Sequence, residues 1–381
     1  MAATANTMKK IVILQDYLRN GGTERQSVHL AGRFAAHGLD TTLLTFRPGG
    51  VLAPPSAQSQ ISTGQQQHSA NYKFQSLQSF DTHLDFFAPR LIPALRRLAP
   101  DIVLCMGRMA NCKAGRIARA LPAVAVISTM RTGKKLPRAY IRSLHTTSHV
   151  IANSHAIAKT LVENYDVPDE KISVIHNAIV HDAGGAPQPE ESTDAAPPAA
   201  LQSFSPSALP HRLLCVAMLR PEKNHHELIK IFSQLPPAPP TELHIIGAGS
   251  ELLPCCSAVK RMGMVGRVHF HGYLSDPSPY YKQARIAVLT SHSESLPNFL
   301  VEAHMHGIPS VAYAVGGVAE CGGIAITPGN QSAFIAALTR LLNDPEHHAA
   351  ESARVAAHAQ EHFAPQTQLR RYLEIFAKVT T

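Results

Sequence analysis

Two glutamates, Glu294 and Glu302, stand eight positions apart in the second half of this 381-residue chain. An apolar run that is typical of a buried strand, residues 286–290, comes just before them. Pro297 suits the first position of a helix and disfavours helical backbone in the residues before it. The spacing therefore predicts Glu294 on a loop and Glu302 about five residues into a helix, roughly 7 Å beyond its N-terminus.

This arrangement could bind a ligand that carries hydroxyl groups on both sides of an anion. A helix N-terminus offers unpaired N–H groups and the positive end of the helix dipole to a phosphate. Carboxylates suit hydroxyl recognition because each accepts strong hydrogen bonds. A sugar nucleotide has this layout, with a sugar, a diphosphate and a ribose in sequence. The pattern therefore indicates a sugar-nucleotide site.

Two further clusters follow predicted strands. Gly21 and Gly22 open a helix, and the missing Cβ there lets backbone amides approach a phosphate or a sugar. They do not form a G-x-G-x-x-G fingerprint, so NAD binding is disfavoured. Arg220 and Lys223 follow the first strand of a later alternating region, where two cations could neutralise a diphosphate leaving group.

Nine short segments, taken in order, resemble motifs of the retaining glycosyltransferases of the GT4 family, which have the GT-B fold. The segments are GGTER at 21–25, IANS at 151–154, VIHN at 174–177, RPEKN at 220–224, SHSE at 291–294, LPN at 296–298, EA at 302–303, GIP at 307–309 and GGVAE at 316–320. The order of the whole set, more than any single match, carries the resemblance.

The resemblance implies roles for the residues around the two glutamates. Glu294 would contact hydroxyls of the donor sugar, and Glu302 would contact the ribose hydroxyls. The segment from Leu296 through Pro297 to Asn298 would bind oxygens of the sugar and phosphate through backbone amides. The family commonly has glycine after the first glutamate, where this chain has a serine.

The resemblance also implies that Gly21 and Gly22 face the donor diphosphate and that Lys223 stabilises the leaving group. The commonest family pattern places an arginine where this chain has a methionine, and the role is assigned here to Arg220, two residues later. Arg131 stands where many relatives keep a histidine. It either contacts the sugar or phosphate or only belongs to a basic face.

The elements that must position these residues alternate between strand-like and helix-like stretches, which indicates parallel sheets flanked by helices. The fold class is α/β, with two Rossmann-like domains facing across a cleft, as in GT-B proteins. The expected parts are an N-terminal acceptor-side domain, a Pro- and Ala-rich linker, a nucleotide-sugar domain and a last helix that could cross back, at residues 1–181, 182–210, 211–365 and 366–381. Residues 48–80 are expected to form a long surface loop, followed by a helix over 83–98.

Composition narrows the class of protein. Hydrophobic residues make up 45% and charged residues 16% of the chain, as in globular proteins. No apolar run reaches 18 residues, and the first ten residues lack the apolar core of a signal peptide. The six cysteines form no C-x-x-C pair, which favours free thiols in a reducing compartment. A cytoplasmic location is therefore expected.

Charge is unevenly distributed along the chain. Residues 1–180 hold 21 Lys and Arg against 10 Asp and Glu, and residues 181–381 hold 14 against 17. The basic half either favours an anionic partner, such as the inner face of a membrane that carries a lipid-linked acceptor, or is a solvated face that aids solubility. No aromatic stacking platform or recognition-helix pattern supports nucleic-acid binding.

The 22 histidines raise the question of a metal site. The pairs at 225–226, 304 with 306, and 347–348 lack partner carboxylates at ligand spacing, so surface or helix-end histidines are expected and no metal is predicted. No cofactor is expected beyond the donor substrate, a UDP- or GDP-sugar.

The predicted function is transfer of a hexose from a nucleotide diphosphate sugar to a glycan or lipid-linked acceptor, in synthesis of a surface polysaccharide or lipopolysaccharide. The resemblance implies retention of anomeric configuration without a catalytic metal. Two alternatives stay open: a GT-B synthase that makes a small free glycoside, and a non-catalytic protein that binds an anionic ligand.

Overall fold

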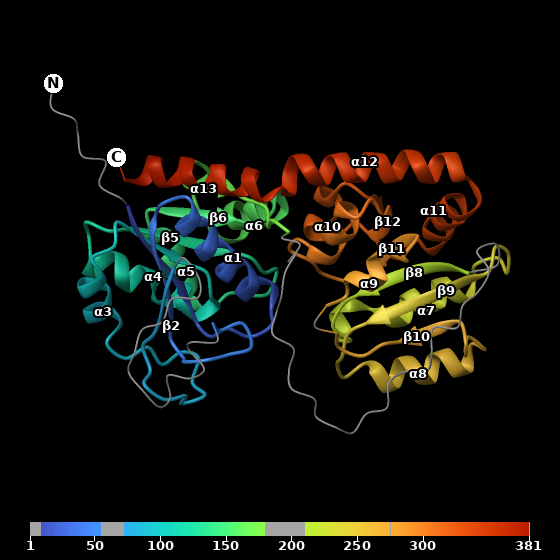
Figure 1. The fold of residues 1–381 in the computed structure, drawn as a ribbon, viewed down its shortest axis with the longest axis horizontal. Helices are drawn as coiled ribbons and strands as arrows, with labels where there is room; N and C mark the ends of the chain where they lie inside the picture. Colours follow the sequence, from blue (N-terminus) through green and yellow to red (C-terminus); the bar gives the residue numbers. More distant parts are fainter. Residues whose placement is uncertain (1–8, 55–71, 180–209, 275, 381) are drawn as a thin grey trace.

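The computed structural model describes residues 9–54, 72–179, 210–274 and 276–380. These residues form two α/β domains that lie side by side, with two helices running along both (Figure 1). Each domain is built on one sheet whose strand pairs are all parallel. The prediction of two Rossmann-like α/β domains is confirmed.

The first domain contains a seven-stranded sheet in the order β3-β2-β1-β4-β5-β6-β7. Its strands are β1 Lys10–Gln15, β2 Asp40–Thr45, β3 Lys73–Ser76, β4 Ile102–Cys105, β5 Ala125–Met130, β6 His149–Ala152 and β7 Ile172–Val174. Five of the six residues of β1 are buried, as expected for a strand covered on both faces. Strands β2 and β3 lie on one side of β1, and β4 to β7 lie on the other. The strand order therefore reverses between β1 and β4, and the loops after these two strands diverge at their carboxyl ends.

The helices of the first domain are α1 Gly22–Ala36, α3 Leu91–Leu98, α4 Arg108–Ala120, α5 Arg138–Thr146 and α6 His155–Tyr165, with the 3-10 turn η2 Asp169–Lys171.

Two predictions about the first domain were wrong. The expected loop over 48–80 contains β3, which pairs with β2 at the sheet edge. The expected helix over 83–98 begins only at Leu91, because ion pairs hold residues 81–85 in a loop.

The second domain contains a six-stranded sheet in the order β10-β9-β8-β11-β12-β13. Its strands are β8 His211–Val216, β9 Thr241–Ile246, β10 Val268–Phe270, β11 Ile286–Leu289, β12 Ser310–Tyr313 and β13 Ile324–Ile326. Its helices are α7 His225–Ser233, α8 Leu252–Arg261, α9 Ser278–Tyr281, α10 Asn298–Met305 and α11 Gln331–Asn343, with the 3-10 turns η3 Pro221–Lys223 and η4 Gly316–Cys321. The predicted linker, 182–210, lies outside the described residues except for Pro210.

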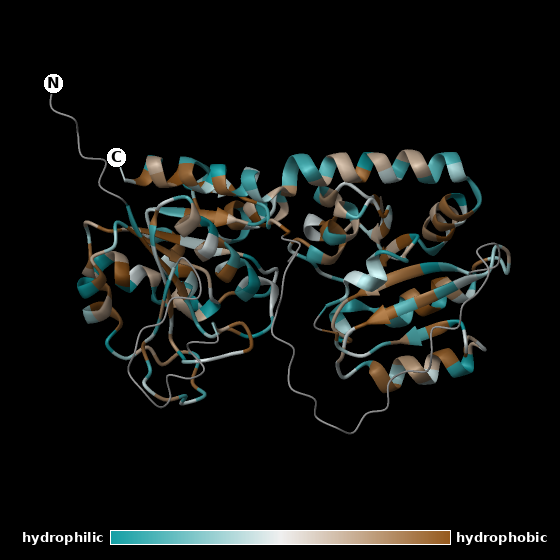
Figure 2. Cartoon of the chain, in the orientation of Figure 1, coloured by the Kyte–Doolittle hydropathy of each residue, from teal (hydrophilic) through white to brown (hydrophobic). Residues whose placement is uncertain are grey.

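The chain returns to the first domain at its C-terminal end. Helix α12, Pro345–Phe363, runs along the second domain, and α13, Pro365–Val379, continues along the first (Figure 1). Tyr372 and Phe376 of α13 are buried against Phe34 of α1, with ring centroids 5.5 and 5.2 Å apart. Both helices mix hydrophilic and hydrophobic residues, as helices that bury one side do (Figure 2).

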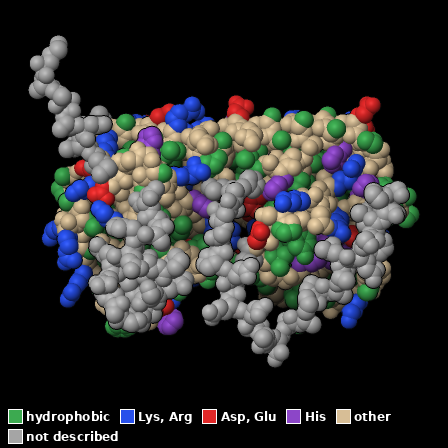
Figure 3. Space-filling model, in the orientation of Figure 1, with side chains coloured by type: hydrophobic (Ala, Val, Ile, Leu, Met, Phe, Trp, Pro, Cys, Tyr) green, Lys and Arg blue, Asp and Glu red, His purple; other side chains and the backbone are tan. Residues whose placement is uncertain are grey.

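Surface charge, free cysteines and the character of the helices were also predicted from the sequence. Lys and Arg side chains are numerous on the visible face of the first domain (Figure 3). All six cysteines are free, and Cys105, Cys215, Cys255 and Cys321 are buried. Among the described helices, none combines the length and apolar character needed to cross a bilayer.

Candidate active site

Loops that follow the central strands of both sheets meet at a cavity of about 300 Å³, here called the interdomain cavity. Ligands in open α/β folds bind at this position, outside the carboxyl ends of strands where the strand order reverses. Seven of the ten site residues predicted from the sequence line it, namely Gly22, Arg131, Lys223, Glu294, Leu296, Pro297 and Asn298. The remaining three, Gly21, Arg220 and Glu302, lie nearby but are not among its lining residues.

Lys223 and Glu294 form an ion pair in the wall of the interdomain cavity. Lys223 ends the η3 turn after β8, and its Nζ lies 2.6 Å from Oε1 of Glu294 in the loop after β11. Ser291 donates a second hydrogen bond to the same oxygen, at 2.7 Å. Because both bonds end on Oε1, Oε2 remains, within the described part of the chain, to accept a hydrogen bond from a ligand hydroxyl.

Helix α10 begins at the interdomain cavity. Pro297 precedes the helix and Asn298 opens it, so the helix begins one position later than the start at Pro297 that the sequence suggested. Unpaired amides of this first turn are available to an anion. The helix N-terminus, the Lys223 ammonium and the free oxygen of Glu294 therefore combine anion-binding and hydroxyl-binding groups around one space.

Glu302 is the fifth residue of α10, as the spacing predicted. Its Oε2 accepts a hydrogen bond from the Tyr281 hydroxyl at 2.5 Å. Removal of the carboxyl group from water raises the pKa of Glu302 above its ordinary value, and the bond from Tyr281 and the charge of Arg25 only partly oppose this. The group is thus held among protein atoms, one turn beyond the start of α10.

The glycine pair of the first domain permits a close approach to the second domain. Gly21 precedes α1 and Gly22 begins it. A Cβ on Gly22 would lie 3.0 Å from Nδ2 of Asn298, and a Cβ on Gly21 would lie 2.3 Å from a carboxylate oxygen of Glu24. A side chain at Gly22 would therefore crowd Asn298 at the start of α10, whereas one at Gly21 would displace the Glu24 carboxylate within the first domain.

Arg131 follows β5 and stands between the two domains. Its guanidinium donates to Asn177 and, at 2.8 Å, to the hydroxyl of Tyr372 on α13. Its Nε is buried and has no hydrogen-bond partner among the described residues. Because Arg131 lines the interdomain cavity, this unpaired donor belongs to a group that can also meet a ligand there.

Polar contacts hold the domains together beside the cavity. Nδ2 of Asn177 donates to Oδ1 of Asn298 at 2.7 Å. The Glu320 carboxylate of the second domain accepts bonds from the amides of His155 and Ala156 at the start of α6, at 2.7 and 3.0 Å, and contacts Nε2 of His176 at 2.9 Å. Burial alone would raise the pKa of Glu320, but these bonds outweigh it and hold the pKa below its ordinary value.

His155, His176 and Glu320 lie close enough together to be considered for a metal ion. Both oxygens of Glu320 already accept hydrogen bonds from the first domain, so this carboxylate serves as an interdomain contact. The sequence predicted histidines at the surface or at helix ends. His225 and His304 lie near helix ends, as expected, but both are buried. His304 bridges Ser310 and the carbonyl of Cys321.

A second, wide cavity of about 780 Å³ adjoins the first and shares Thr23 and Arg131 with it. Arg220 lines this wide cavity and has extended backbone, as its place before a proline predicted. Asp16 lies in its floor and accepts bonds from the amides of Met109 and Ala110, at 2.9 and 2.6 Å. Burial raises the pKa of Asp16 to about 6, and the two amide bonds limit the rise.

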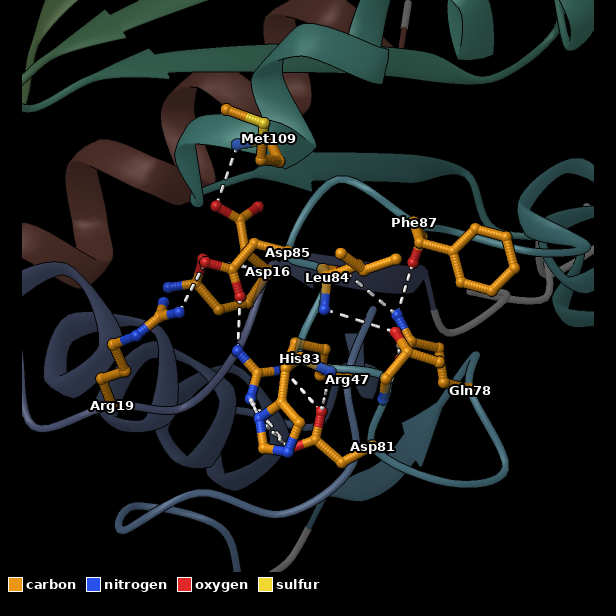
Figure 4. A network of polar contacts seen from close by, with 12 residues as sticks. Asp16, Arg19, Arg47, Gln78, Asp81, His83, Leu84, Asp85, Phe87 and Met109 are labelled. Atoms are coloured by element: carbon orange, nitrogen blue, oxygen red, sulfur yellow. Dashed lines mark hydrogen bonds and ion pairs between the residues drawn. The ribbon is translucent and has the colours of Figure 1, made fainter.

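A network of ion pairs shapes the rim of the wide cavity (Figure 4). The Arg47 guanidinium pairs with both oxygens of Asp81, at 2.7 and 2.8 Å, and with Asp85 at 2.7 Å. It also lies over the ring of Tyr17, 3.9 Å from the centroid, which adds a cation–π contact. This buried arginine fixes the loop over 81–85 that forms one side of the cavity.

Several residues around the two cavities were not predicted from the sequence. Tyr281 and Asp16 act through contacts with residues far away in the chain, and nothing in their local sequence distinguishes them. Glu320 ends the matched segment GGVAE at 316–320, so the match was a signal for it. His176 and Asn177 lie within the matched segment VIHN, so the match itself was an available signal.

Comparison with known families and structures identifies the class of this protein. Residues 20–183 match the family described as Glycosyltransferase Family 4, and residues 206–358 match Glycosyl transferases group 1. The two matches together take in most of the chain. The protein is therefore a member of the GT4-type glycosyltransferases and has the GT-B fold.

Individual relatives are distant. The chain is 31% identical over 83 residues to the Vi polysaccharide biosynthesis protein VipC/TviE of Salmonella typhi, covering 22% of this chain and 14% of the relative. It is 27% identical over 241 residues to D-inositol 3-phosphate glycosyltransferase of Streptomyces griseus, covering 57% of this chain and 51% of the relative. The chain thus spans about half, or less, of the length of these curated relatives.

Among solved structures, HepE of Anabaena in complex with UDP has a similar fold. The TM-score is 0.75, the identity 19%, and the match covers 97% of this chain and all of HepE. The same protein has also been solved with UDP-glucose.

Proposed function

We propose that this glycosyltransferase moves a hexose from a nucleotide diphosphate sugar to a glycan or lipid-linked acceptor, with retention of anomeric configuration. One observation carries the proposal: Lys223, Glu294 and the N-terminus of α10 surround one cavity at the meeting of the two domains. A cation and a helix end suit a diphosphate, and a carboxylate suits sugar hydroxyls.

The donor is a UDP- or GDP-sugar. UDP and UDP-glucose in HepE support the first, although that similarity is one of fold. Glu302 binds the ribose hydroxyls, and backbone amides from Leu296 to Asn298 bind sugar and phosphate oxygens. Gly21 and Gly22 bring the first domain close enough to enclose the diphosphate. No further cofactor takes part in this proposal.

In the reaction, the bond between the sugar C1 and the diphosphate oxygen breaks while the acceptor oxygen bonds to C1 on the same face. The proton of the acceptor passes to the departing phosphate oxygen. Lys223 and the α10 dipole stabilise the negative charge that develops on that oxygen, in place of a metal ion. Arg220 and Arg131, which both line the wide cavity, add positive charge where the two cavities join.

The acceptor binds in the wide cavity, which opens beside the transferred sugar. Loop residues at its rim expose large apolar side chains, with Phe86 58% and Leu84 43% accessible. The first half of the chain carries a net charge of about +11. Apolar side chains next to a basic surface suit an acceptor embedded in an anionic membrane, with the protein bound peripherally at the cytoplasmic face.

Vesicle binding tests this membrane contact. The protein is expected to sediment with anionic phosphatidylglycerol vesicles at low salt and to dissociate as salt screens charges beyond about 8–10 Å. Phe86→Ser should weaken the binding, and Leu253→Ser, a change of an exposed apolar residue in the second domain, should not. Equal binding to neutral and anionic vesicles would rule out the electrostatic contact.

A synthase that makes a small free glycoside is the second candidate, and the name of the Streptomyces griseus relative favours it. The charged lining of the wide cavity, which includes Arg19, Arg108 and Lys134, would then bind a small anionic acceptor. Turnover with lipid-linked as opposed to small phosphorylated acceptors separates the two.

Proton NMR of the product tests the reaction itself. With an α-linked donor and excess EDTA, the transferred or hydrolysed sugar should appear first as the α-anomer. First appearance of the β-anomer would contradict retention. Loss of turnover in EDTA that Mg²⁺ or Mn²⁺ restores would contradict the metal-independent step.

A further inference from the structure

Two adjacent strands of the second domain place polar side chains on one face of the sheet. Glu242 and His244 are two residues apart on β9, and His269 and His271 are two residues apart at β10 and just after it. Side chains two apart in a strand point to the same face. The strands pair in parallel with His269 directly beside His244. The cluster therefore follows from the register of β9 and β10.

The potential ligand atoms of three of these residues converge. Nε2 of His244 lies 3.2 Å from Oε2 of Glu242, and Nε2 of His269 lies 3.7 Å from the same oxygen. All three atoms lie within 4.8 Å of one another. Ligands of a tetrahedral zinc ion, at bond lengths of about 2.0–2.2 Å, are roughly 3.3 Å apart. Only small side-chain shifts are needed to reach that geometry.

His269 supplies an independent indication that a ligand belongs here. Its Nε2 is buried, faces the Glu242 carboxylate, and has no hydrogen-bond partner among the described residues. A buried nitrogen without a partner costs free energy that a bond to a metal ion would recover. The side chain as a whole keeps 36% of its surface exposed, so the cluster lies near solvent although Nε2 itself is covered.

A chain of hydrogen bonds behind His244 sets the orientation of its ring. Nδ1 of His244 lies 3.0 Å from Nε2 of His271, and Nδ1 of His271 lies 3.0 Å from the Tyr280 hydroxyl. When His244 donates from Nδ1 and His271 donates from Nδ1 to Tyr280, Nε2 of His244 is unprotonated, and a cation can bind between it and the Glu242 carboxylate that it contacts. Histidine ligands in metal sites are commonly held in this way.

We propose that Glu242, His244 and His269 form a binding site for a divalent transition-metal ion of the zinc class, outside the interdomain cavity. Two imidazoles and one carboxylate match zinc preferences and disfavour Mg²⁺ and Ca²⁺, which bind mainly oxygen. Solvent completes the coordination. Tyr280 is followed in α9 by Tyr281, which bonds Glu302, so the metal site is linked to the candidate ribose carboxylate through one short helix. The site itself does not depend on the proposed reaction.

Calorimetric titration of the full chain, freed of metal with EDTA and then dialysed, tests the site. Zn²⁺ should bind with a stoichiometry near one in its tightest phase and raise the Tm, whereas Mg²⁺ should do neither. His269→Gln and Glu242→Gln should each weaken that phase at least 10-fold and abolish the Tm rise. The Tm values of the metal-free variants confirm that they fold.

His155→Gln is the matched control, because His155 belongs to the other histidine–glutamate group, at the domain contact. It should leave the tight Zn²⁺ phase unchanged. Loss of that phase in His155→Gln, its persistence in His269→Gln and Glu242→Gln, or the absence of a tight phase in the wild type would each overturn the proposal. None of these readouts requires transferase activity, so failure here leaves the proposed function untouched.

Discussion

Lys223→Met is expected to lower kcat about 10²- to 10³-fold, the usual loss when one preorganised group that stabilises transition-state charge is removed. Lys223 is the cation in the wall of the interdomain cavity closest to Glu294, and methionine keeps its length without its charge. The effect should appear mainly in kcat, because charge on the leaving oxygen grows as the sugar–phosphate bond breaks.

The structure also predicts a complication in that variant. Removing Lys223 leaves Glu294, whose side chain is only 9% exposed, with the hydroxyl of Ser291 as its remaining partner. The single variant should therefore lose stability, and adding Glu294→Gln should restore the Tm without restoring kcat. Lys230→Met, at an exposed position of α7, is the matched control and should change neither quantity. Wild-type kcat in Lys223→Met would remove this residue from the chemistry.

Glu302→Gln is expected to weaken donor binding about 10- to 150-fold, because a hydrogen bond to a charged acceptor is worth about 1.5–3 kcal/mol. The carboxylate can accept from both ribose hydroxyls, and the amide that replaces it accepts with only one atom. Titration of the nucleoside diphosphate into both proteins measures the loss. Asn298 and Lys223 stay in place, so binding of the diphosphate part should weaken but persist.

The pKa of Glu302 adds a pH dependence. Burial raises this pKa, and the ionised form is the one that accepts two hydroxyls. As the pH is lowered, donor affinity should therefore begin to fall at a higher pH than it would with a glutamate of ordinary pKa. Tyr281→Phe removes a hydrogen bond that lowers the pKa and should move the fall to still higher pH.

Stability should respond in the opposite sense. A raised pKa means that ionised Glu302 costs folding free energy, and this cost grows as pH rises through the folded-state value. Glu302→Gln should therefore be no less stable than wild type at neutral pH. Unchanged affinity in Glu302→Gln, or a pH dependence of affinity in that variant equal to that of the wild type, would refute the ribose assignment.

The sequence predicted those features of the fold that are local. The apolar run inside strand β1 and the Gly21–Gly22 turn can be recognised from a few residues, and so can the order of strand, loop and helix around Glu294. Strand β3 was missed because its four residues follow a polar stretch, and only pairing with β2 makes them a strand. Helix α3 starts late because Arg47, more than 30 residues earlier, binds Asp81 and Asp85.

In the candidate site, too, the sequence predicted the residues that have a local pattern. Residue types and spacing correctly grouped Lys223, Glu294 and Asn298, which belong to one domain and line one cavity. Arg220, expected beside the diphosphate with Lys223, lines the adjoining wide cavity, and its role at the diphosphate stays a prediction.

Contacts that cross strands or domains had no local signal. Tyr281 reaches Glu302 through the packing of α9 on α10. The cluster of Glu242, His244 and His269 depends on the register of β9 with β10, which the sequence of either strand alone does not give. Periodicity places residues on a face, but it does not say which faces become neighbours.

A thermal-shift panel of UDP-, GDP- and ADP-sugars tests most directly whether the interdomain cavity is a nucleotide-sugar site. At 100 times its Kd a ligand stabilises the folded state by about 2.7 kcal/mol, which raises the Tm of a chain of this length by roughly 3 °C. We predict such a rise with a UDP- or GDP-sugar, and its loss in the Lys223→Met and Glu302→Gln double variant. No rise with any of these sugars, or an equal rise in the double variant, would contradict the account.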